Sequence, residues 1–256
     1  MAKVIAVTNQ KGGVGKTTTA INLSTYVALE SYKVLLVDID PQGNASSGIG
    51  SARKRKQATV YKVLTNELPI DEVITPTKVT GLDVLPANIE LAGAEIELAM
   101  EQRREYFLRD VLNTITPRYD YIFIDCPPSL GLLTLNALVA ADAVLIPMQC
   151  EYYALEGLSS LRDTIYTVQR YLNPPLRISG IAFTLFDSRT NLSIQVVDEV
   201  KRYFPQEIYT SIIPRNIRLG EAPSYGQPIA LYDPKSKGAE AYQELAREVI
   251  EHEEKY

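Results

Sequence analysis

The segment NQKGGVGKTT, at residues 9–18, places glycines, lysines and threonines in a spacing that can bind phosphate. The common phosphate-loop pattern is G-x-x-x-x-G-K-[ST], and its last three positions are met by Gly15, Lys16 and Thr17. Its first glycine is replaced by Gln10. Glycines lack a Cβ atom, so backbone N–H groups can approach phosphate oxygens closely. The spacing therefore predicts a nucleoside triphosphate site on a loop that departs from the common pattern.

The side chains of this loop have separable predicted roles. We expect Lys16 to reach the β- and γ-phosphates, Thr17 to hold Mg²⁺, and Thr18 to contact the α-phosphate. The backbone cradle comprises Gly12, Gly13, Val14 and Gly15. A second lysine, Lys11, adds positive charge where negative charge accumulates during phosphoryl transfer. This combination predicts ATP and Mg²⁺ as cofactors and ATP hydrolysis as the reaction.

Carboxylates end two apolar segments in a manner suited to phosphoryl transfer. The run YIFID ends at Asp125, which we expect to bind Mg²⁺ through water. The run VLLVDID contributes Asp38 and Asp40, which would point the same way in an extended strand. We expect Asp40 to position or polarise the attacking water, and Asp38 to support the water shell of the metal. The alternative that both are solvated turn acids stays open.

Apolar, β-rich runs must position these residues, and they alternate with helical patterns along the chain. The expected strands span 3–8, 34–38, 82–86, 121–125, 143–147 and 178–184. Most are continuous apolar runs, which is typical of strands covered on both faces. Helical patterns at 18–31 and 155–172 lie between strands, and an amphipathic, acidic pattern at 239–256 predicts a helix packed on the surface. We predict an α/β, three-layer P-loop NTPase fold with a mostly parallel central sheet, which binds ligands at the carboxyl ends of its strands.

Composition limits the classes of protein that this chain can belong to. It is 46% hydrophobic over 256 residues, and we expect one domain spanning 1–256. Its two cysteines form no CxxC pair, which fits a reducing cytosol, and no signal peptide or apolar run of membrane-spanning length is present. The formal net charge of −5 means that any nucleic-acid binding must come from a local basic patch.

Four motifs occur in order along nearly the whole chain: KGGVGKTT, DIDPQGN, IDCPPSLG and PRNIRLGEAPSYGQPI. This set resembles the ParA/Soj family of DNA-partition ATPases, which belongs to the deviant Walker A group together with MinD. The resemblance runs from about residue 3 to residue 250. The segments EYYALEGL, which begins at Glu151, and FDSRTNLS, at 186–193, point to the Soj branch.

The resemblance implies an ATP-dependent homodimer with two nucleotides in its interface. In this arrangement Lys11 reaches across to the phosphates of the partner's ATP. The resemblance also places Pro214 and Asn216 in the adenine pocket, with Arg215 close by. Glu151 is expected beside the nucleotide, near the ribose or the dimer face.

The family also binds double-stranded DNA non-specifically, and only as the ATP-bound dimer. Arg189 and Arg218 match the DNA-contact positions of the family, and we add Lys201 and Arg202 from the segment DEVKRYF. The basic run at 54–56 is either a further DNA contact or a solvated loop. A basic face that forms only on dimerisation would reconcile DNA binding with an acidic chain.

The same resemblance implies the other partners and the cellular location. ParB, a centromere-binding protein, would stimulate hydrolysis through a basic N-terminal tail, which an acidic protein attracts. The replication initiator DnaA is carried as a further candidate partner. The phosphate loop begins within ten residues of Met1, so we expect no N-terminal helix-turn-helix domain. We expect a cytoplasmic, nucleoid-associated protein.

Three alternatives remain at this stage. A MinD-like ATPase of cell-division-site selection would need a C-terminal helix with a basic polar face, and the tail REVIEHEEKY is acid-rich. An iron–sulfur ATPase would need suitably placed cysteines, and neither Cys126 nor Cys150 fits that placement. A nucleotide-dependent scaffold without hydrolysis is disfavoured by Asp40. We therefore expect no membrane partner.

Overall fold

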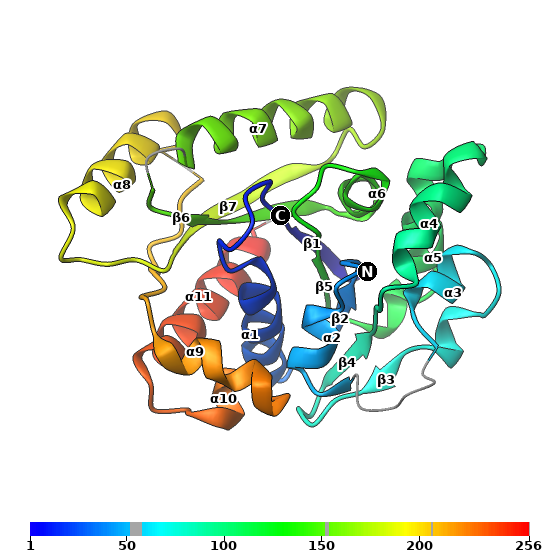
Figure 1. Ribbon diagram of the computed structural model, residues 1–256, viewed down its shortest axis with the longest axis horizontal. Coiled ribbons are helices and arrows are strands. Elements are labelled where there is room, and N and C mark those ends of the chain that lie inside the picture. Colours follow the sequence, from blue (N-terminus) through cyan, green and yellow to red (C-terminus); the bar gives the residue numbers. More distant parts are fainter. Residues whose placement is uncertain (52–57, 152–153, 206, 256) are drawn as a thin grey trace.

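The computed structural model describes residues 1–51, 58–151, 154–205 and 207–255 (Figure 1). Its strands are β1 (Lys3–Val7), β2 (Val34–Asp38), β3 (Thr75–Pro76), β4 (Leu82–Leu85), β5 (Tyr121–Asp125), β6 (Ala143–Gln149) and β7 (Arg177–Thr184). The helices are α1 (Lys16–Leu29), α2 (Asn44–Gly48), α3 (Val60–Leu64), α4 (Leu91–Glu97), α5 (Phe107–Asn113), α6 (Leu132–Ala140), α7 (Ala154–Tyr171), α8 (Asn191–Tyr203), α9 (Ile217–Glu221), α10 (Ile229–Tyr232) and α11 (Lys237–Glu253). The basic run at 54–56 lies outside the described residues.

The strands form one seven-stranded sheet in the order β3-β4-β2-β5-β1-β6-β7. Among the described residues, β3 alone pairs in the antiparallel direction, with β4, and the other strand pairs within the sheet are parallel. All six predicted strands are present with small changes at their ends. The antiparallel edge strand β3 was not predicted, because two residues leave no periodic pattern to detect.

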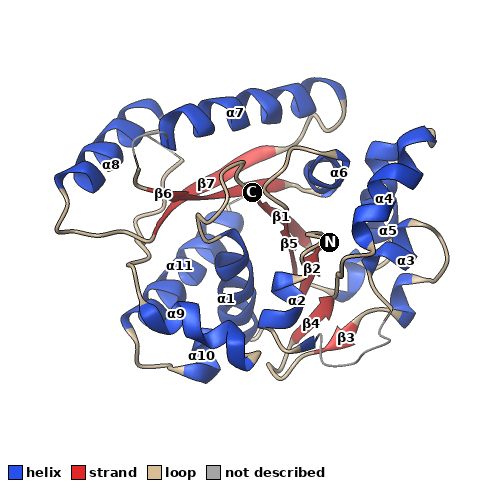
Figure 2. Cartoon of the chain, viewed as in Figure 1, coloured by secondary structure: helices blue, strands red, loops and turns tan. Residues whose placement is uncertain are grey.

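Helices cover both faces of the sheet (Figures 1 and 2). One face packs against α1, α2, α10 and α11, and the other against α3 to α8. The inner strands are buried along their whole length: all five residues of β2 and all five of β5 are buried. The predicted three-layer α/β fold is therefore confirmed. Its strands are continuously apolar because helices cover both faces of the sheet.

The C-terminal pattern forms α11, which packs along α1. Its N-cap is Ser236, whose side chain accepts a hydrogen bond from the backbone N–H of Ala239. The Tyr242 hydroxyl lies 3.0 Å from the Thr19 hydroxyl on α1, and both side chains are buried. The prediction of a surface helix packed on the protein is confirmed. Within the described residues, the structure contains no helix that is long and apolar enough to cross a membrane.

The segment IYTSI, at 208–212, has the composition of a strand but does not form a regular one. It follows β7 with a single bridge between Ile181 and Ile208 and intermittent backbone hydrogen bonds, such as that from Tyr209 N to Ile181 O at 3.1 Å. Its continuation bridges Phe186 and Pro214. Tyr209 and Ile213 are four positions apart, while their partners Ile181 and Phe183 are two apart, so a continuous ladder does not form.

Candidate nucleotide-binding site

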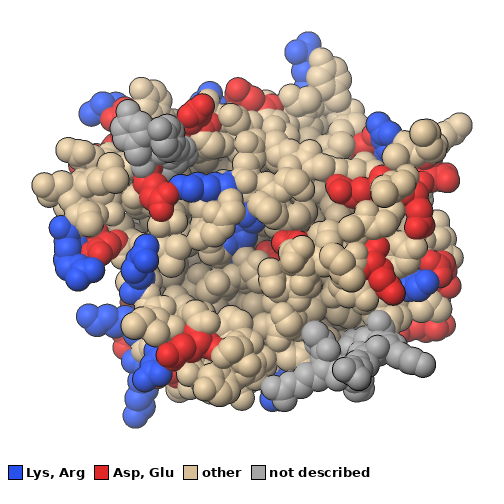
Figure 3. All heavy atoms as spheres, in the orientation of Figure 1, with Lys and Arg blue, Asp and Glu red and all other residues tan. Residues whose placement is uncertain are grey.

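The predicted phosphate loop and the acidic residues meet at one edge of the sheet. Asp125 stands in register with Val7 on β1 and with Asp38 on β2, so three strands end at the same level. The loop at 8–15 begins there, directly after β1, and leads into α1. In Figure 3 the surface of the molecule is hollowed near the centre of the view, and basic side chains lie beside the hollow. Tertiary structure therefore gathers chemistry that the sequence spreads over more than a hundred residues.

The backbone of the loop takes conformations that suit phosphate binding. Gly13 and Gly15 have positive φ angles of 76° and 82°, a region that residues with a Cβ atom rarely adopt. A Cβ atom built on Gly12 or Gly13 would meet nothing within 4 Å, so the space beside them is open. A loop of this shape, next to the N-terminus of α1, presents N–H groups to an anion. Val14 is buried and anchors the loop from beneath.

Asn9 fastens the start of the loop, which sequence reasoning missed. Its Nδ2 donates to the carbonyl of Pro147 on β6 at 2.8 Å, and its Oδ1 accepts from the backbone N–H of Lys11 at 3.0 Å. Both contacts are to backbone, so no charge or motif rule reveals them. In the sequence, the only indication of this role is that Asn9 is a polar residue soon after an apolar strand.

Lys16 is a buried lysine, with only 7% of the residue exposed. Its Nζ donates to the carbonyl oxygen of Lys11 at 2.9 Å. Burial lowers the pKa of Lys16, and the negative charges of Asp125 and Asp40 act in the opposite direction. A lysine held among backbone carbonyl groups and carboxylates is poised to bind an anionic phosphate.

Lys11 forms an ion pair with Glu151, which follows β6. The two side chains are 34% and 44% exposed, so the pair sits at the surface of the site. Sequence reasoning expected both residues beside the nucleotide, and the structure brings them together. Thr17 and Thr18, in the first turn of α1, are half-buried.

Asp38 is fully buried, and its carboxylate is already engaged. Its Oδ2 accepts from the backbone N–H of Ser46 at 2.8 Å and from the Ser46 hydroxyl at 2.6 Å, and its Oδ1 accepts from Asp40 N at 3.1 Å. Burial raises the pKa of Asp38 to about 6, and the bonds from Ser46 oppose the shift. Ser46 has no sequence signal, because its role depends on α2 folding back over β2.

Asp40 is also buried, at 7% exposure, and accepts from the backbone N–H of Gln42 at 2.9 Å. This burial excludes the reading of Asp38 and Asp40 as two solvated turn acids. Asp40 lies near enough to Lys16 to influence its pKa.

Asp125 is buried with neither carboxylate oxygen in a hydrogen bond of normal geometry to any described residue. Burial and the charge of Asp38 raise the pKa of Asp125 well above its usual range, while Thr17 and Lys16 act in the opposite direction. A buried carboxylate without partners is costly unless a cation or water meets it. Its position beside Thr17 therefore fits a Mg²⁺ ion held partly through water.

Mg²⁺ keeps several waters and is usually shared between one or two protein groups and substrate phosphates. Among the described residues, no group of three His, Cys, Asp or Glu side chains could hold a metal ion by itself. The donors at this site, Thr17 and Asp125, therefore suit a Mg²⁺ ion that arrives with the nucleotide. The site therefore suits ATP with Mg²⁺.

The predicted adenine-pocket residues lie on the segment that follows 208–212. Pro214 is half-buried and bridges Phe186, just beyond the carboxyl end of β7. Asn216 is the N-cap of α9, and its Oδ1 accepts from Arg218 N at 2.8 Å. Arg215 is exposed and acts electrostatically on Asp187. These residues therefore lie beyond the carboxyl end of β7, and their role in an adenine pocket stays a prediction.

The predicted DNA contacts are exposed, and three of the four pair with acids. Arg189 forms bonds of 2.8 and 2.6 Å to Asp187. Arg218 lies 2.8 Å from Glu221 and 3.4 Å from Asp233. The other two are Lys201 and Arg202 at the end of α8, and Arg202 lies 3.2 Å from Glu199. Basic side chains gather on the side of the molecule formed by α8 and α9 (Figure 3).

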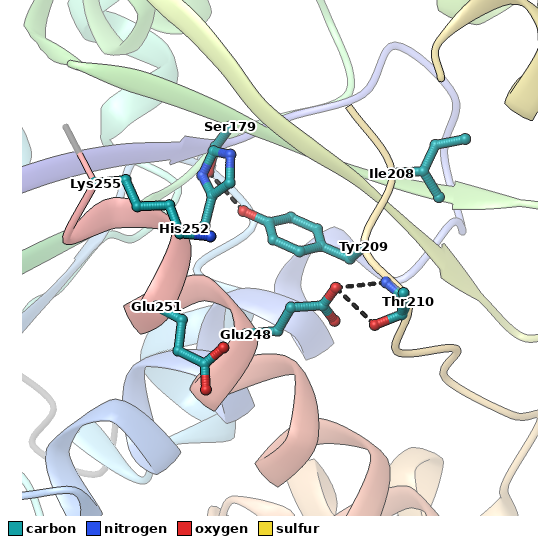
Figure 4. Close-up of a pocket in the computed structure, with 8 residues that line it drawn as sticks. All are labelled: Ser179, Ile208, Tyr209, Thr210, Glu248, Glu251, His252 and Lys255. Atoms are coloured by element: carbon teal, nitrogen blue, oxygen red, sulfur yellow. Dashed lines mark hydrogen bonds between the residues drawn. The ribbon is translucent and has the colours of Figure 1, made fainter. Parts of the chain in front are cut away.

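A separate pocket of about 280 Å³ lies between β7 and the end of α11 (Figure 4). The Ser179 hydroxyl in this pocket donates to Glu253 at 2.7 Å, so the Tyr209 hydroxyl donates to Ser179 at 2.6 Å. Glu248 accepts from Thr210. Ser179 lies near the amino end of β7, away from the phosphate loop, so this pocket is not the nucleotide site.

The two cysteines are buried and free. Burial raises the pKa of Cys150 to about 11 and that of Cys126 well above its usual range. Neutral, buried thiols of this kind behave as small apolar residues rather than as cluster ligands. The structure gives no support to the iron–sulfur alternative.

Known proteins resemble the chain over nearly its full length. A family model described as an AAA domain matches residues 2–178. The chain is 57% identical to the sporulation initiation inhibitor protein Soj of Bacillus subtilis, covering 97% of this chain and 98% of that protein. It is 55% identical to the chromosome partitioning protein ParA of Myxococcus xanthus, covering 99% and 89%. It is 52% identical to the chromosome-partitioning ATPase Soj of Treponema pallidum, covering 98% of each.

Solved structures show the same fold. Cobyrinic acid a,c-diamide synthase from Mycobacterium smegmatis, with bound ADP and magnesium, superposes with a TM-score of 0.87 at 39% identity, covering 99% of this chain and 96% of that one. The cell division ATPase MinD of Pyrococcus furiosus superposes with a TM-score of 0.82 at 25% identity, covering 98% and 99%. With the phosphate loop, the buried acids and these relatives together, the chain belongs to the ParA/Soj family of chromosome-partitioning ATPases.

Proposed function

We propose that this ATPase acts as a nucleotide-switched DNA-binding protein in chromosome or plasmid segregation. ATP with Mg²⁺ joins two copies of the chain into an ATP-sandwich dimer, the dimer binds double-stranded DNA non-specifically, and hydrolysis releases it. The observation that carries the proposal is the pair of lysines at one phosphate loop. Lys16 is buried within the loop, while Lys11 is half-exposed at its rim and paired with Glu151.

The chemistry divides among residues of this chain and its partner copy. Lys16 and the loop N–H groups bind the phosphates of the chain's own ATP, with Thr18 at the α-phosphate. Thr17, and Asp125 through water, would hold Mg²⁺, which would supply positive charge to neutralise the phosphates. Asp40 positions or polarises the attacking water, while Asp38, fixed by Ser46, supports the water shell of the metal.

Lys11 acts across the dimer. It leaves Glu151 and approaches the phosphates of the partner's ATP, where it stabilises charge that develops in the transition state. Without a γ-phosphate two lysine-bearing faces gain little by meeting, so dimerisation requires ATP. Glu151 then lies beside the nucleotide, while Pro214 and Asn216 contact the adenine with Arg215 nearby.

DNA binding follows from dimerisation. Arg189 and Arg218, with Lys201 and Arg202, come from both copies and neutralise DNA phosphates, with a dissociation constant of order 10⁻⁴ to 10⁻⁶ M per site at physiological salt. A ParB-type protein with a basic tail stimulates hydrolysis, and a chain of net charge −5 attracts such a tail. DnaA is a further candidate partner. A cytoplasmic, nucleoid-associated location and a single domain over 1–256 complete the proposal.

DNA co-sedimentation tests the switch. The purified protein is incubated with DNA and Mg²⁺ in the presence of ATP, ADP or no nucleotide, at two salt concentrations. We expect DNA binding with ATP alone, and we expect it to weaken steeply at the higher salt concentration. Equal binding in all three nucleotide states would contradict the proposal.

A MinD-like function at membranes is the alternative, and the MinD fold similarity motivates it. The described tail helix α11 carries Glu240, Glu244, Glu248 and Glu251, which anionic lipid would repel. Sedimentation with anionic liposomes in the presence of ATP separates the two. Liposome binding without DNA binding would favour the alternative.

A further inference from the structure

The phosphate loop accepts a hydrogen bond from β7, the strand at one edge of the sheet. The Thr184 hydroxyl donates to the carbonyl oxygen of Val14 at 2.7 Å. Thr184 is the last residue of β7, which lies two strands from β1 in the sheet order. Both residues are 1% exposed, so water does not compete for this bond.

The bond fixes the orientation of the peptide unit that joins Val14 and Gly15. The peptide is planar and trans, so its C=O and N–H groups point in opposite directions. A carbonyl held toward Thr184 therefore directs the Gly15 N–H away from Thr184. Among the described residues that N–H has no hydrogen-bond acceptor. Without the hydrogen bond from Thr184, the peptide that joins Val14 and Gly15 could rotate more freely, because glycine adopts a positive φ readily.

We propose that Thr184 is a positioning residue for phosphate binding. It holds the Gly15 N–H in the orientation that meets a phosphate oxygen, so that the loop does not reorganise when the nucleotide binds. Donors fixed in advance bind an anion better than donors that must first be ordered. Thr184 itself makes no contact with the phosphate.

The position of Thr184 is set by its own surroundings rather than by the loop. The next residue, Leu185, has a positive φ of 50°, which is strained for a branched side chain. That turn lets Phe186 N donate to Ile213 O at 3.1 Å, and lets Arg215 N donate to Phe186 O at 3.1 Å. Before the strained residue, Ile213 N donates to Phe183 O at 2.8 Å, so backbone pairing on both sides of Leu185 holds the end of β7 in place. The hydroxyl is therefore rigid before any ligand arrives.

Threonine suits this role better than other residues of similar size and shape. Its β-branched side chain has few χ1 rotamers, so the hydroxyl does not wander. Valine has the same shape without the donor, and serine has the donor without the methyl group. These differences allow the hydrogen bond to be separated from packing.

The test compares two pairs that differ mainly in the hydroxyl: wild type with Thr184→Val, and Thr184→Ser with Thr184→Ala. ADP affinity is measured by calorimetry with Mg²⁺, together with KM and kcat for ATP. We expect each variant without the hydroxyl to bind ADP about tenfold more weakly than its partner, as the loss of a buried hydrogen bond implies. We expect Thr184→Ser to stay within about threefold of wild type.

Thr25→Val is the matched control. The Thr25 hydroxyl is buried in α1 and has no hydrogen-bond partner among the described residues. The same chemical change there should leave ADP affinity unchanged. If Thr184→Ser bound ADP as weakly as Thr184→Ala, or Thr184→Val bound it as tightly as wild type, the inference would be overturned. The ADP measurement requires neither DNA binding nor dimerisation, so its outcome stands apart from the proposed switch.

Discussion

Lys11 and Glu151 form an ion pair within one chain, at the rim of the phosphate loop. Residues 140 positions apart meet because β1 and β6 are neighbours in the sheet. The same Lys11 offers its carbonyl oxygen to Lys16 at 2.9 Å, so the two lysines are linked through the backbone. We assign the positive charge of Lys11 a role at the partner's ATP. In the monomer, Glu151 of the same chain therefore neutralises that charge.

Lys16→Ala and Lys11→Ala are expected to separate binding from assembly. Lys16 is buried beside the phosphate cradle, so its loss should abolish detectable ATP binding. Lys11→Ala should keep ATP binding within about tenfold of wild type, because the loop and Lys16 remain. Calorimetry gives the binding, and light scattering with ATP gives the dimer. A Lys11→Ala protein that still dimerises with ATP would refute the cross-dimer role.

Asp40→Ala should bind ATP and lose hydrolysis. The carboxylate is buried near Lys16, where it can act on water, and general-base contributions are about 10²- to 10⁴-fold. Phosphate release is measured with DNA and the ParB-type partner present, and ATP binding is measured in parallel. Gln42→Ala is the control, because it keeps the backbone N–H that bonds to Asp40. Unchanged hydrolysis in Asp40→Ala would remove Asp40 from the mechanism.

Arg189→Glu and Arg218→Glu should each lose DNA while keeping the ATP dimer. Each arginine that contacts a phosphate contributes about one unit to the slope of log affinity against log salt. The milder changes to Ala should therefore lower this slope by about one unit each. Arg247→Glu, at an exposed position of α11, is the matched charge reversal. DNA binding that falls equally in all three reversals would point to net charge rather than to a specific surface.

Asp187→Asn should strengthen DNA binding. Hydrogen bonds from Arg189 hold the pKa of Asp187 well below its usual range, so Asp187 is charged and neutralises the arginine in the free protein. Its removal releases Arg189 for DNA phosphate. Any lost negative charge helps DNA binding to some extent, so Asp198→Asn on α8 is the charge-matched control. Equal gains in the two variants, measured by fluorescence anisotropy with ATP, would contradict a specific role for Asp187.

Glu253→Gln should destabilise the fold by about 2 kcal/mol at neutral pH. Glu253 is fully buried and accepts from Arg177 at 3.1 Å and from Ser179 at 2.7 Å. Its pKa is lowered from 4.5, so its stabilisation is present above that value and is lost as pH falls through the folded-state pKa. The gap between the two proteins in urea unfolding should therefore narrow in acid. Glu251→Gln, which is exposed, should change stability little.

The parallel sheet and the phosphate loop could both be predicted from the amino-acid sequence. Both are local: continuous apolar runs specify buried strands, and glycines with Lys16 and Thr17 specify a phosphate cradle in ten residues. Asp125 was also readable, because a carboxylate at the end of an apolar run stands out. These signals need no knowledge of which strands are neighbours.

Only tertiary structure decided which residues support the site. Asn9, Ser46 and Thr184 act through backbone groups of other elements, and such contacts depend on strand order rather than on local pattern. The carboxylate oxygens of Asp125 accept no hydrogen bond of normal geometry from a described residue, while those of Asp38 accept several, although both residues end buried strands. The physical reason is that hydrogen-bond satisfaction is set by what folds back over each strand end. Sequence spacing can place a polar group at an edge, but only packing decides what meets it there.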